Sequence, residues 1–479
     1  MAIRSTLVLA AVLFAAHPVL AQQPCDQLPA LKLPGLTITS AISVPAGPFS
    51  IQGTQNRLFS GEVPAFCRVI AIAPPEVRFE IWMPARWNRK LLAVGNGGFA
   101  GTISYGPMLK PLVRGYATSS TDTGHVGANT NDGTWALGHY ERIVDFADRG
   151  VHIMAEADKV ILRAFYGNTP AHSYFNGCSQ GGHEALIEAQ RYPNDFDGII
   201  AGDPANNWTR HYAGGHLWSA MAMEGEGYIP AAKVPLIAEA VNEECDALDG
   251  VKDGVLNDPR RCRFNPAKLL CKAGDAPTCL TAPQVAAVNK LWTGLRNASG
   301  DQIYPGIVPG GEKGPGGWAN WITGPEPGKS AHANLGIPFY RYMVFDDANW
   351  DYRTFRFEAA NGFDSDVDFT DTKLGALFNA NSPDMTAFQA RGGKLIQYHG
   401  WSDPDITPLN SIQYYESVAK FMARGGNHGL RDTKEFYRLF MVPGMQHCGG
   451  GPGATTFDMI EPLEQWVEKG TAPEKVIAA

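Results

Sequence analysis

Several features that would define a common protein class are missing from this sequence. Beyond the first 20 or so residues, no apolar run approaches the roughly 20 residues that a membrane helix needs. The formal charge is −8 over 479 residues, without the basic stripe of a nucleic-acid-binding protein. No C-x2-C pair or neighbouring histidine cluster indicates a zinc site. We therefore expect a chain that binds neither nucleic acid nor a membrane.

The N-terminus has the layout of a cleaved secretory signal. Residues 1–21 contain one basic residue (Arg4), a short apolar run from Leu7 to Ala16, and small residues before Gln22. This predicts a secreted or periplasmic protein, in which an even number of cysteines favours disulfides. Eight cysteines allow 105 pairings, so their spacing does not choose one. They are Cys25, Cys67, Cys178, Cys245, Cys262, Cys271, Cys279 and Cys448.

Strand-like and helix-like segments alternate over residues 90–204, which is typical of a parallel sheet covered by helices. Helical periodicity runs from Asp145 to Tyr166 and from Glu184 to Arg191. The predicted strands are 90–94, 115–121, 172–175, 196–201, 393–398 and 437–442. We predict an α/β fold of the α/β-hydrolase type, built from residues 22–205 and 380–479. Between these two parts the alternation of strand-like and helix-like segments stops, so residues 206–379 are predicted to form an inserted lid domain.

Gly177-x-Ser179-x-Gly181 fits the nucleophile elbow of serine hydrolases, with a strand before it and a helix after it. Taken alone, the motif is more often a tight glycine turn in an ordinary βα unit. The partners strengthen the catalytic interpretation, since the expected chain order is Ser, acid, His. His447 lies in a glycine-rich loop after a late strand. Asp403 follows the preceding strand and would orient the imidazole, with Asp405 as the alternative acid.

Two further features surround the predicted triad. Cys178 precedes the serine and Cys448 follows the histidine, so a disulfide between them would hold the two side chains together. An ester substrate also needs an oxyanion hole. We expect one donor at the backbone N–H of Gln180 and the other in the turn Gly95–Gly98, at Gly98 or Gly97. The alternative is that this glycine turn serves only sheet geometry.

These motifs resemble the tannase and feruloyl esterase family, which includes a bacterial hydrolase of mono(hydroxyethyl) terephthalate. The resemblance covers nearly the whole mature chain and is most specific in three segments: GCS-x-GG from Gly177, HGW-x-D from His399 and GM-x-HC from Gly444. It implies the Cys178–Cys448 disulfide and a lid between serine and acid. It also implies the pairs Cys25–Cys67, Cys245–Cys262 and Cys271–Cys279. Family members usually continue past the last helix with a further tail containing cysteines, and we expect one edge of this chain to be more open.

Residues 246–255 (DALDGVKDGV) hold three carboxylates and two glycine turns. From the residues alone, this is equally an acidic solvated turn or an oxygen-rich calcium loop, and it lacks the EF-hand spacing. The resemblance implies a structural Ca²⁺. Its expected ligands are the side chains of Asp246, Asp249 and Asp253 and the carbonyls of Val251 and Val255.

Together these features predict a serine esterase that hydrolyses esters of aromatic acids through Ser179, His447 and Asp403. Feruloyl and other hydroxycinnamoyl esters, derived from plant cell walls or polyphenols, rank first, galloyl esters second and terephthalate monoesters third. A peptidase and a calcium-stabilised secreted binding module are the alternatives. Seven aromatic residues of the lid could line an acyl pocket, although for each of them lid core is the simpler interpretation. They are Trp318, Trp321, Phe339, Tyr340, Tyr342, Phe345 and Trp350.

Overall fold

The computed structural model describes residues 23–53, 58–359, 364–423 and 429–479. The predicted signal peptide, residues 1–21, lies outside these residues. Within them, no helix combines the length and apolar character needed to cross a membrane.

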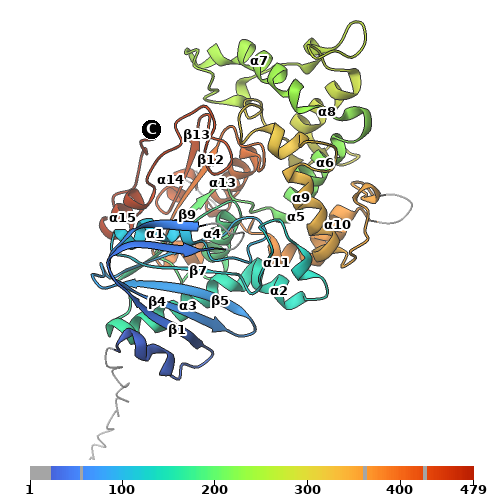
Figure 1. Cartoon of the computed structure of the whole chain (residues 1–479). Helices are drawn as coiled ribbons and strands as arrows, with labels where there is room; N and C mark the ends of the chain where they lie inside the picture. Colours follow the sequence, from blue (N-terminus) through green and yellow to red (C-terminus); the bar gives the residue numbers. More distant parts are fainter. Residues whose placement is uncertain (1–22, 54–57, 360–363, 424–428) are drawn as a thin grey trace, which may run out of the picture.

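The centre of the molecule is a nine-stranded mixed sheet of strand order β1-β4-β5-β7-β6-β8-β9-β12-β13 (Figure 1). Strands β7, β6, β8, β9, β12 and β13 run parallel, and each predicted strand corresponds to one of them. The antiparallel strands β1, β4 and β5 were not foreseen from the sequence. The bounds are β1 Thr37–Val44, β4 Phe66–Ala73, β5 Val77–Pro84, β6 Lys90–Val94, β7 Ala117–Thr121, β8 His172–Cys178, β9 Gly198–Gly202, β12 Lys394–Gly400 and β13 Tyr437–Val442.

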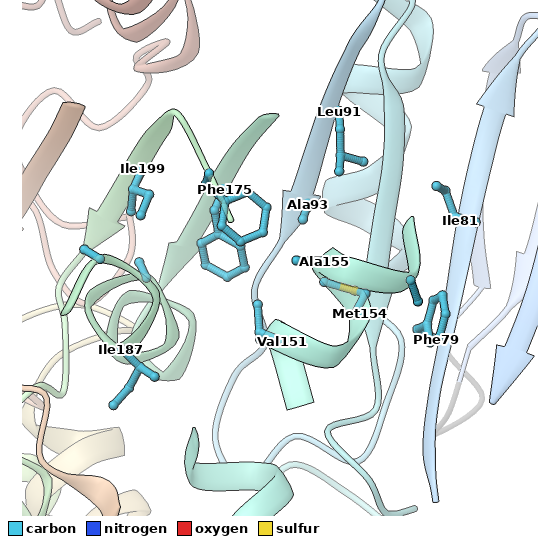
Figure 2. Packing of buried hydrophobic residues seen from close by; sticks show 14 of the residues in the cluster. Phe79, Ile81, Leu91, Ala93, Val151, Met154, Ala155, Phe175, Ile187 and Ile199 are labelled. Atoms are coloured by element: carbon cyan, nitrogen blue, oxygen red, sulfur yellow. The ribbon is translucent and has the colours of Figure 1, made fainter. Parts of the chain in front are cut away.

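Helices cover both faces of this sheet because its strands are apolar on both sides. In β6, Leu91 and Ala93 face one core while Leu92 and Val94 face the other, as the two-residue period of a strand requires. The first core includes α3, α4 and α13, and Figure 2 shows Val151 and Met154 of α3 beside its strands. The second core includes α1 and α15. The bounds are α1 Tyr105–Val113, α2 Tyr140–Val144, α3 Gly150–Tyr166, α4 Gln180–Arg191, α13 Pro408–Met422, α14 Gly429–Thr433 and α15 Ile460–Lys469.

Between β9 and β12, the residues that the structure describes contribute no strand to the large sheet. Its helices α6, α7 and α8 gather at one end of the molecule, away from β1, β4 and β5 (Figure 1). A separate apolar cluster lies entirely within residues 222–322. The bounds here are α5 Trp208–His211, α6 Trp218–Ala222, α7 Val234–Cys245, α8 Ala282–Thr293, β10 Gly294–Arg296, β11 Gln302–Pro305, α9 Ala331–Pro338, α10 Asp366–Thr370, α11 Ala376–Phe378 and α12 Thr386–Ala390; the remaining strands are β2 Gly47–Gln52 and β3 Leu58–Val63. The exact lid limits, 206 and 379, stay a prediction.

Candidate active site

Four polar side chains follow four adjacent parallel strands at the same edge of the sheet. Ser179 follows β8, Asp203 follows β9, Asp403 lies after β12 and His447 lies after β13. In parallel α/β sheets, ligands bind at the carboxyl ends of the strands. Ser179 and His447 are 268 positions apart in the chain, and the sheet thereby brings them to the same end of its strands.

The backbone at Ser179 is strained in the way a nucleophile elbow requires. Its φ is 66° and its ψ is −119°, a conformation that L residues rarely adopt. A side chain at Gly177 would place its Cβ 2.3 Å from the carbonyl oxygen of Gly181, so only glycine fits before the turn. The serine therefore stands at the start of α4, between strand and helix.

Asp403 and His447 make a direct hydrogen bond. Nδ1 of His447 lies 2.8 Å from Oδ2 of Asp403. The other carboxylate oxygen accepts the backbone N–H groups of Asp405 and Ile406 at 2.8 and 3.1 Å. Burial disfavours the charge, yet the charge of His447 and hydrogen bonds from His399 and His447 outweigh burial and hold the pKa of Asp403 below its usual value. The carboxylate thus fixes the ring with a proton on Nδ1.

Nε2 of His447 faces a second carboxylate, Oδ2 of Asp405, at 3.3 Å. In the described part of the chain, no hydrogen bond joins the Ser179 hydroxyl to the imidazole, whose nitrogens face Asp403 and Asp405 instead. Burial opposes protonation of His447, but the charges of Asp403 and Asp405 outweigh it and raise the pKa of His447 to about 10. Apo hydrogen bonds of catalytic groups often form only with substrate bound.

A disulfide joins the two loops across 270 residues of sequence, between Cys178 and Cys448. Beside it, the buried carboxylate of Asp203 accepts the backbone N–H of Gly400 at 2.8 Å and that of Cys448 at 2.6 Å. Asp203 therefore fastens the loop after β12 to the histidine loop. Sequence analysis missed this residue, although an acidic residue directly after the strand ending at Gly202 is a signal that could have found it.

The glycine turn after β6 packs against the start of α4. The Asn96 carbonyl accepts the N–H of Gly181 at 2.8 Å, and Glu184 accepts the N–H of Asn96 at 2.9 Å. Gly98 has a φ of 56°, and a Cβ there would lie 2.2 Å from the Thr130 carbonyl oxygen. Within the described residues, the N–H groups of Gln180, Gly97 and Gly98 have no hydrogen-bond acceptor and remain available to an oxyanion. Glu184, which positions this turn, was not foreseen.

His399 and the lid aromatics complete the surroundings. His399 is buried and contacts the carbonyl of Ile406 at 2.8 Å and the Ser411 hydroxyl at 2.7 Å, in the loop after β12 and in α13. The Trp321 ring lies edge-on to His447, with ring centroids 5.1 Å apart. Trp318 is fully buried in the apolar cluster formed by residues 222–322 alone. Phe339 and Tyr340 are fully buried in a second cluster, which the inserted segment shares with Phe99 and Phe146.

The other three disulfides are the pairs implied by the family resemblance, Cys25–Cys67, Cys245–Cys262 and Cys271–Cys279. The loop 246–255 lies between Cys245 and Cys262. Its carboxylates fold back on the loop backbone: Asp246 accepts the N–H of Gly254 at 3.0 Å and Asp249 accepts that of Val251 at 3.0 Å. Across the described residues, Asp246, Asp249 and Asp253 form no salt bridge and are not gathered as tightly as ligands around one ion.

Known proteins resemble this chain in sequence and in fold. Residues 62–479 match the tannase and feruloyl esterase family. The chain is 40% identical to an uncharacterized esterase of Xanthomonas campestris pv. campestris (96% of this chain, 84% of that protein) and 32% identical to a probable feruloyl esterase B-2 of Aspergillus terreus (94% and 86%). The crystal structure of feruloyl esterase B from Aspergillus oryzae superposes with a TM-score of 0.83 at 29% identity, covering 95% of this chain and 92% of that one. The chain therefore belongs to the tannase and feruloyl esterase family, as a carboxylic ester hydrolase of the α/β-hydrolase fold.

Proposed function

We propose that this esterase hydrolyses esters of aromatic acids, feruloyl and related hydroxycinnamoyl esters first, through a triad of Ser179, His447 and Asp403. The observation that carries the proposal is the 2.8 Å contact between Asp403 and Nδ1 of His447, on a loop whose next residue is disulfide-bonded to the neighbour of Ser179. A triad is recognised by such roles and geometry.

The reaction follows from these positions. Neutral His447 takes the proton of the Ser179 hydroxyl as Oγ attacks the ester carbonyl, and Asp403 stabilises the imidazolium that forms. The oxyanion accepts hydrogen bonds from the N–H of Gln180 and that of Gly98 or Gly97. His447 then protonates the departing alcohol. Water, deprotonated by the same imidazole, hydrolyses the acyl-enzyme and releases the aromatic acid.

The choice of hydroxycinnamoyl esters as the first substrate class rests on the names of the similar proteins. Matches of about 32% identity carry the name feruloyl esterase, whereas the tannin acyl hydrolase of Aspergillus niger is 24% identical and shares the fold alone (TM-score 0.75). We therefore propose hydroxycinnamoyl esters before galloyl esters and terephthalate monoesters. Trp321, edge-on to His447, supports an aromatic acyl group. The test is kcat/KM for methyl ferulate, methyl gallate and mono(hydroxyethyl) terephthalate, with the anilide of ferulic acid to measure peptidase-type cleavage. Highest kcat/KM for methyl gallate or the terephthalate ester would overturn the order.

Removing the Cys178–Cys448 disulfide should cost both activity and stability. Cys178→Ser with Cys448→Ser frees the histidine loop, and a misplacement of about 1 Å is expected to lower kcat about 10²-fold. Loss of a 270-residue closed loop is expected to lower the free energy of unfolding by about 5–6 kcal/mol. Kinetics and urea unfolding check the two effects. The matched control, Cys271→Ser with Cys279→Ser, opens only an 8-residue loop and should keep kcat. Equal kcat in both double variants would contradict the coupling of the two loops.

We propose that the protein is exported, to the periplasm or out of the cell. Four disulfides support this, because such bonds persist in oxidising compartments. The predicted signal in residues 1–21 would be the export sequence.

We also propose a structural Ca²⁺ in the loop 246–255. The donor set suits a hard cation, since it consists of three carboxylates and the carbonyls of Val251 and Val255, all oxygen. The carboxylates are not drawn together around one point, so the side chains would turn inward on binding. The ion would fix the loop between Cys245 and Cys262, which lies at a distance from the triad loops along the chain.

Calcium removal should therefore lower stability. At a free concentration 100 times its Kd, one bound ion contributes about 2.7 kcal/mol, so the melting temperature should fall on chelation and recover with Ca²⁺ but not Mg²⁺. Differential scanning calorimetry of wild type and Asp249→Asn measures this. Asp249→Asn should melt at the temperature of the chelated wild type, both with Ca²⁺ and after chelation. Identical melting of wild-type protein with excess Ca²⁺ and after exhaustive chelation would exclude the ion.

A further inference from the structure

The carboxylate of Asp405 lies between the catalytic histidine and the inserted segment. Oδ2 is 3.3 Å from Nε2 of His447, and Oδ1 is 2.9 Å from Nε2 of His216 and 3.3 Å from Nε2 of His332. His216 belongs to the helical turn Tyr212–Leu217 after α5, and His332 to α9. All four side chains are nearly or fully buried. Asp405 is thus hydrogen-bonded to His216 and contacted by His332, both of the inserted segment, and its other oxygen faces His447.

This contact has a definite protonation requirement. Nδ1 of His447 faces a carboxylate oxygen of Asp403 and Nε2 faces one of Asp405, at 2.8 and 3.3 Å. A carboxylate only accepts hydrogen bonds, so both ring nitrogens must carry protons to satisfy both partners. The arrangement is therefore that of the imidazolium. A general base must instead offer a bare Nε2 to the Ser179 hydroxyl, which means that Asp405 stabilises the form of His447 that cannot start the reaction.

From this geometry we infer that Asp405 is a positioning residue that sets the proton affinity of His447 and so the pH at which the esterase becomes active. The inference rests on the proposed role of His447 as the base. Asp405 competes with Ser179 for Nε2 in the resting enzyme. After proton transfer, the same carboxylate helps to stabilise the imidazolium beside the tetrahedral intermediate.

The other ionisable groups around the acid loop, residues 401–407, do not cancel this effect. His216 and His211 are buried, and burial lowers their pKa, for His216 to about 4, so they remain neutral and add no positive charge. The carboxylate of Asp203 accepts the backbone N–H groups of Gly400 and Cys448 and lies within 4.8 Å of His447, so its charge raises the pKa of His447 in the same direction. His399 contacts Asp403 at 3.3 Å and favours its ionised form. Among the described residues, the guanidinium of Arg260 lies over the Trp401 ring of this loop, 5.1 Å from its centroid. The other ionisable groups that face the loop or belong to it are Asp203, Asp403, Asp405, His211, His216, His332, His399, His447 and Tyr304.

The sign of the effect is fixed. Asp405 favours protonated His447 and therefore raises the pKa of His447. The acid limb of the pH profile of kcat/KM reports this pKa in the free enzyme. With Asp405 present, that limb lies at higher pH than it would with Asp403 alone. Removing one charge at 3.3 Å should move that limb down by about 1–3 pH units. At one pH unit below the wild-type midpoint, kcat/KM of the variant, expressed as a fraction of its own plateau, should then be at least about five times the wild-type fraction.

The experiment compares wild type with Asp405→Asn and Asp405→Ala by two measurements. One is the pH profile of kcat/KM for methyl ferulate. The other is the pH titration of the His447 Cε1–H NMR signal, assigned by its absence in His447→Gln, which requires no substrate. Asp301→Asn makes the same chemical change at an exposed position of the β10–β11 hairpin and should reproduce both wild-type curves.

The outcomes separate this inference from the proposed function. We expect both midpoints to move down in both Asp405 variants while the plateau stays within about tenfold of wild type. Midpoints that coincide with those of wild type and Asp301→Asn would overturn the role of Asp405. A protein that hydrolyses no aromatic ester, yet whose His447 titration shifts in Asp405→Asn, would support Asp405 and refute the proposed substrate.

Discussion

Ser179→Ala is expected to lower kcat for methyl ferulate about 10⁶-fold. The variant lacks the Oγ that forms the acyl-enzyme, so only direct attack by water remains, assisted by the oxyanion donors. The methyl side chain fits the site, since the strain at Ser179 lies in the backbone, with a φ of 66°. Substrate binding should therefore persist while the chemistry stops.

Product release measured by chromatography checks the rate, and calorimetric titration with methyl ferulate checks binding. Ser299→Ala, at an exposed position of the β10–β11 turn, is the matched control and should keep the wild-type rate. If purified Ser179→Ala retained more than about 1% of that rate, Ser179 could not be the nucleophile.

Asp403→Asn is expected to lower kcat about 10⁴-fold with little change in fold. The amide oxygen can still accept the N–H groups of Asp405 and Ile406, which now bind Oδ1 at 2.8 and 3.1 Å. The amide nitrogen then faces Nδ1 of His447 and donates to it. This reverses the tautomer, placing the proton on Nε2, where it blocks proton transfer from Ser179.

Comparing Asp403→Asn with Asp405→Asn decides which carboxylate is the triad acid. Both residues contact His447, but at different nitrogens: Asp403 at Nδ1 and Asp405 at Nε2. Asp403→Asn alone should remove the plateau of the pH profile, whereas Asp405→Asn should displace the profile along the pH axis. The reverse pattern would make Asp405 the acid. Steady-state kinetics over the full pH range, with circular dichroism to verify folding, makes the comparison.

Local patterns were enough to predict the centre of the sheet, and they also supply the proposed triad residues at the ends of its strands. Strands β8, β12 and β13 are short apolar runs followed at once by glycine and polar residues, and such runs predict both the strand and the loop at its carboxyl end. The elbow at Ser179 is a local turn, so its glycines predict it directly. By contrast, β1, β4 and β5 were missed, since the strand–helix rhythm on which the fold prediction relied begins only near residue 90.

What the sequence determined by itself was the family, the parallel strands and the order Ser179, Asp403, His447, because strand period, turn chemistry and chain order are properties of neighbouring residues. The tertiary structure alone decided what surrounds His447. Asp203 lies 244 residues from His447 and His216 lies 189 residues from Asp405, and no local pattern predicts which buried side chains meet across a fold. The proton affinity of His447 depends on those long-range contacts, since charge and burial act through space rather than along the chain.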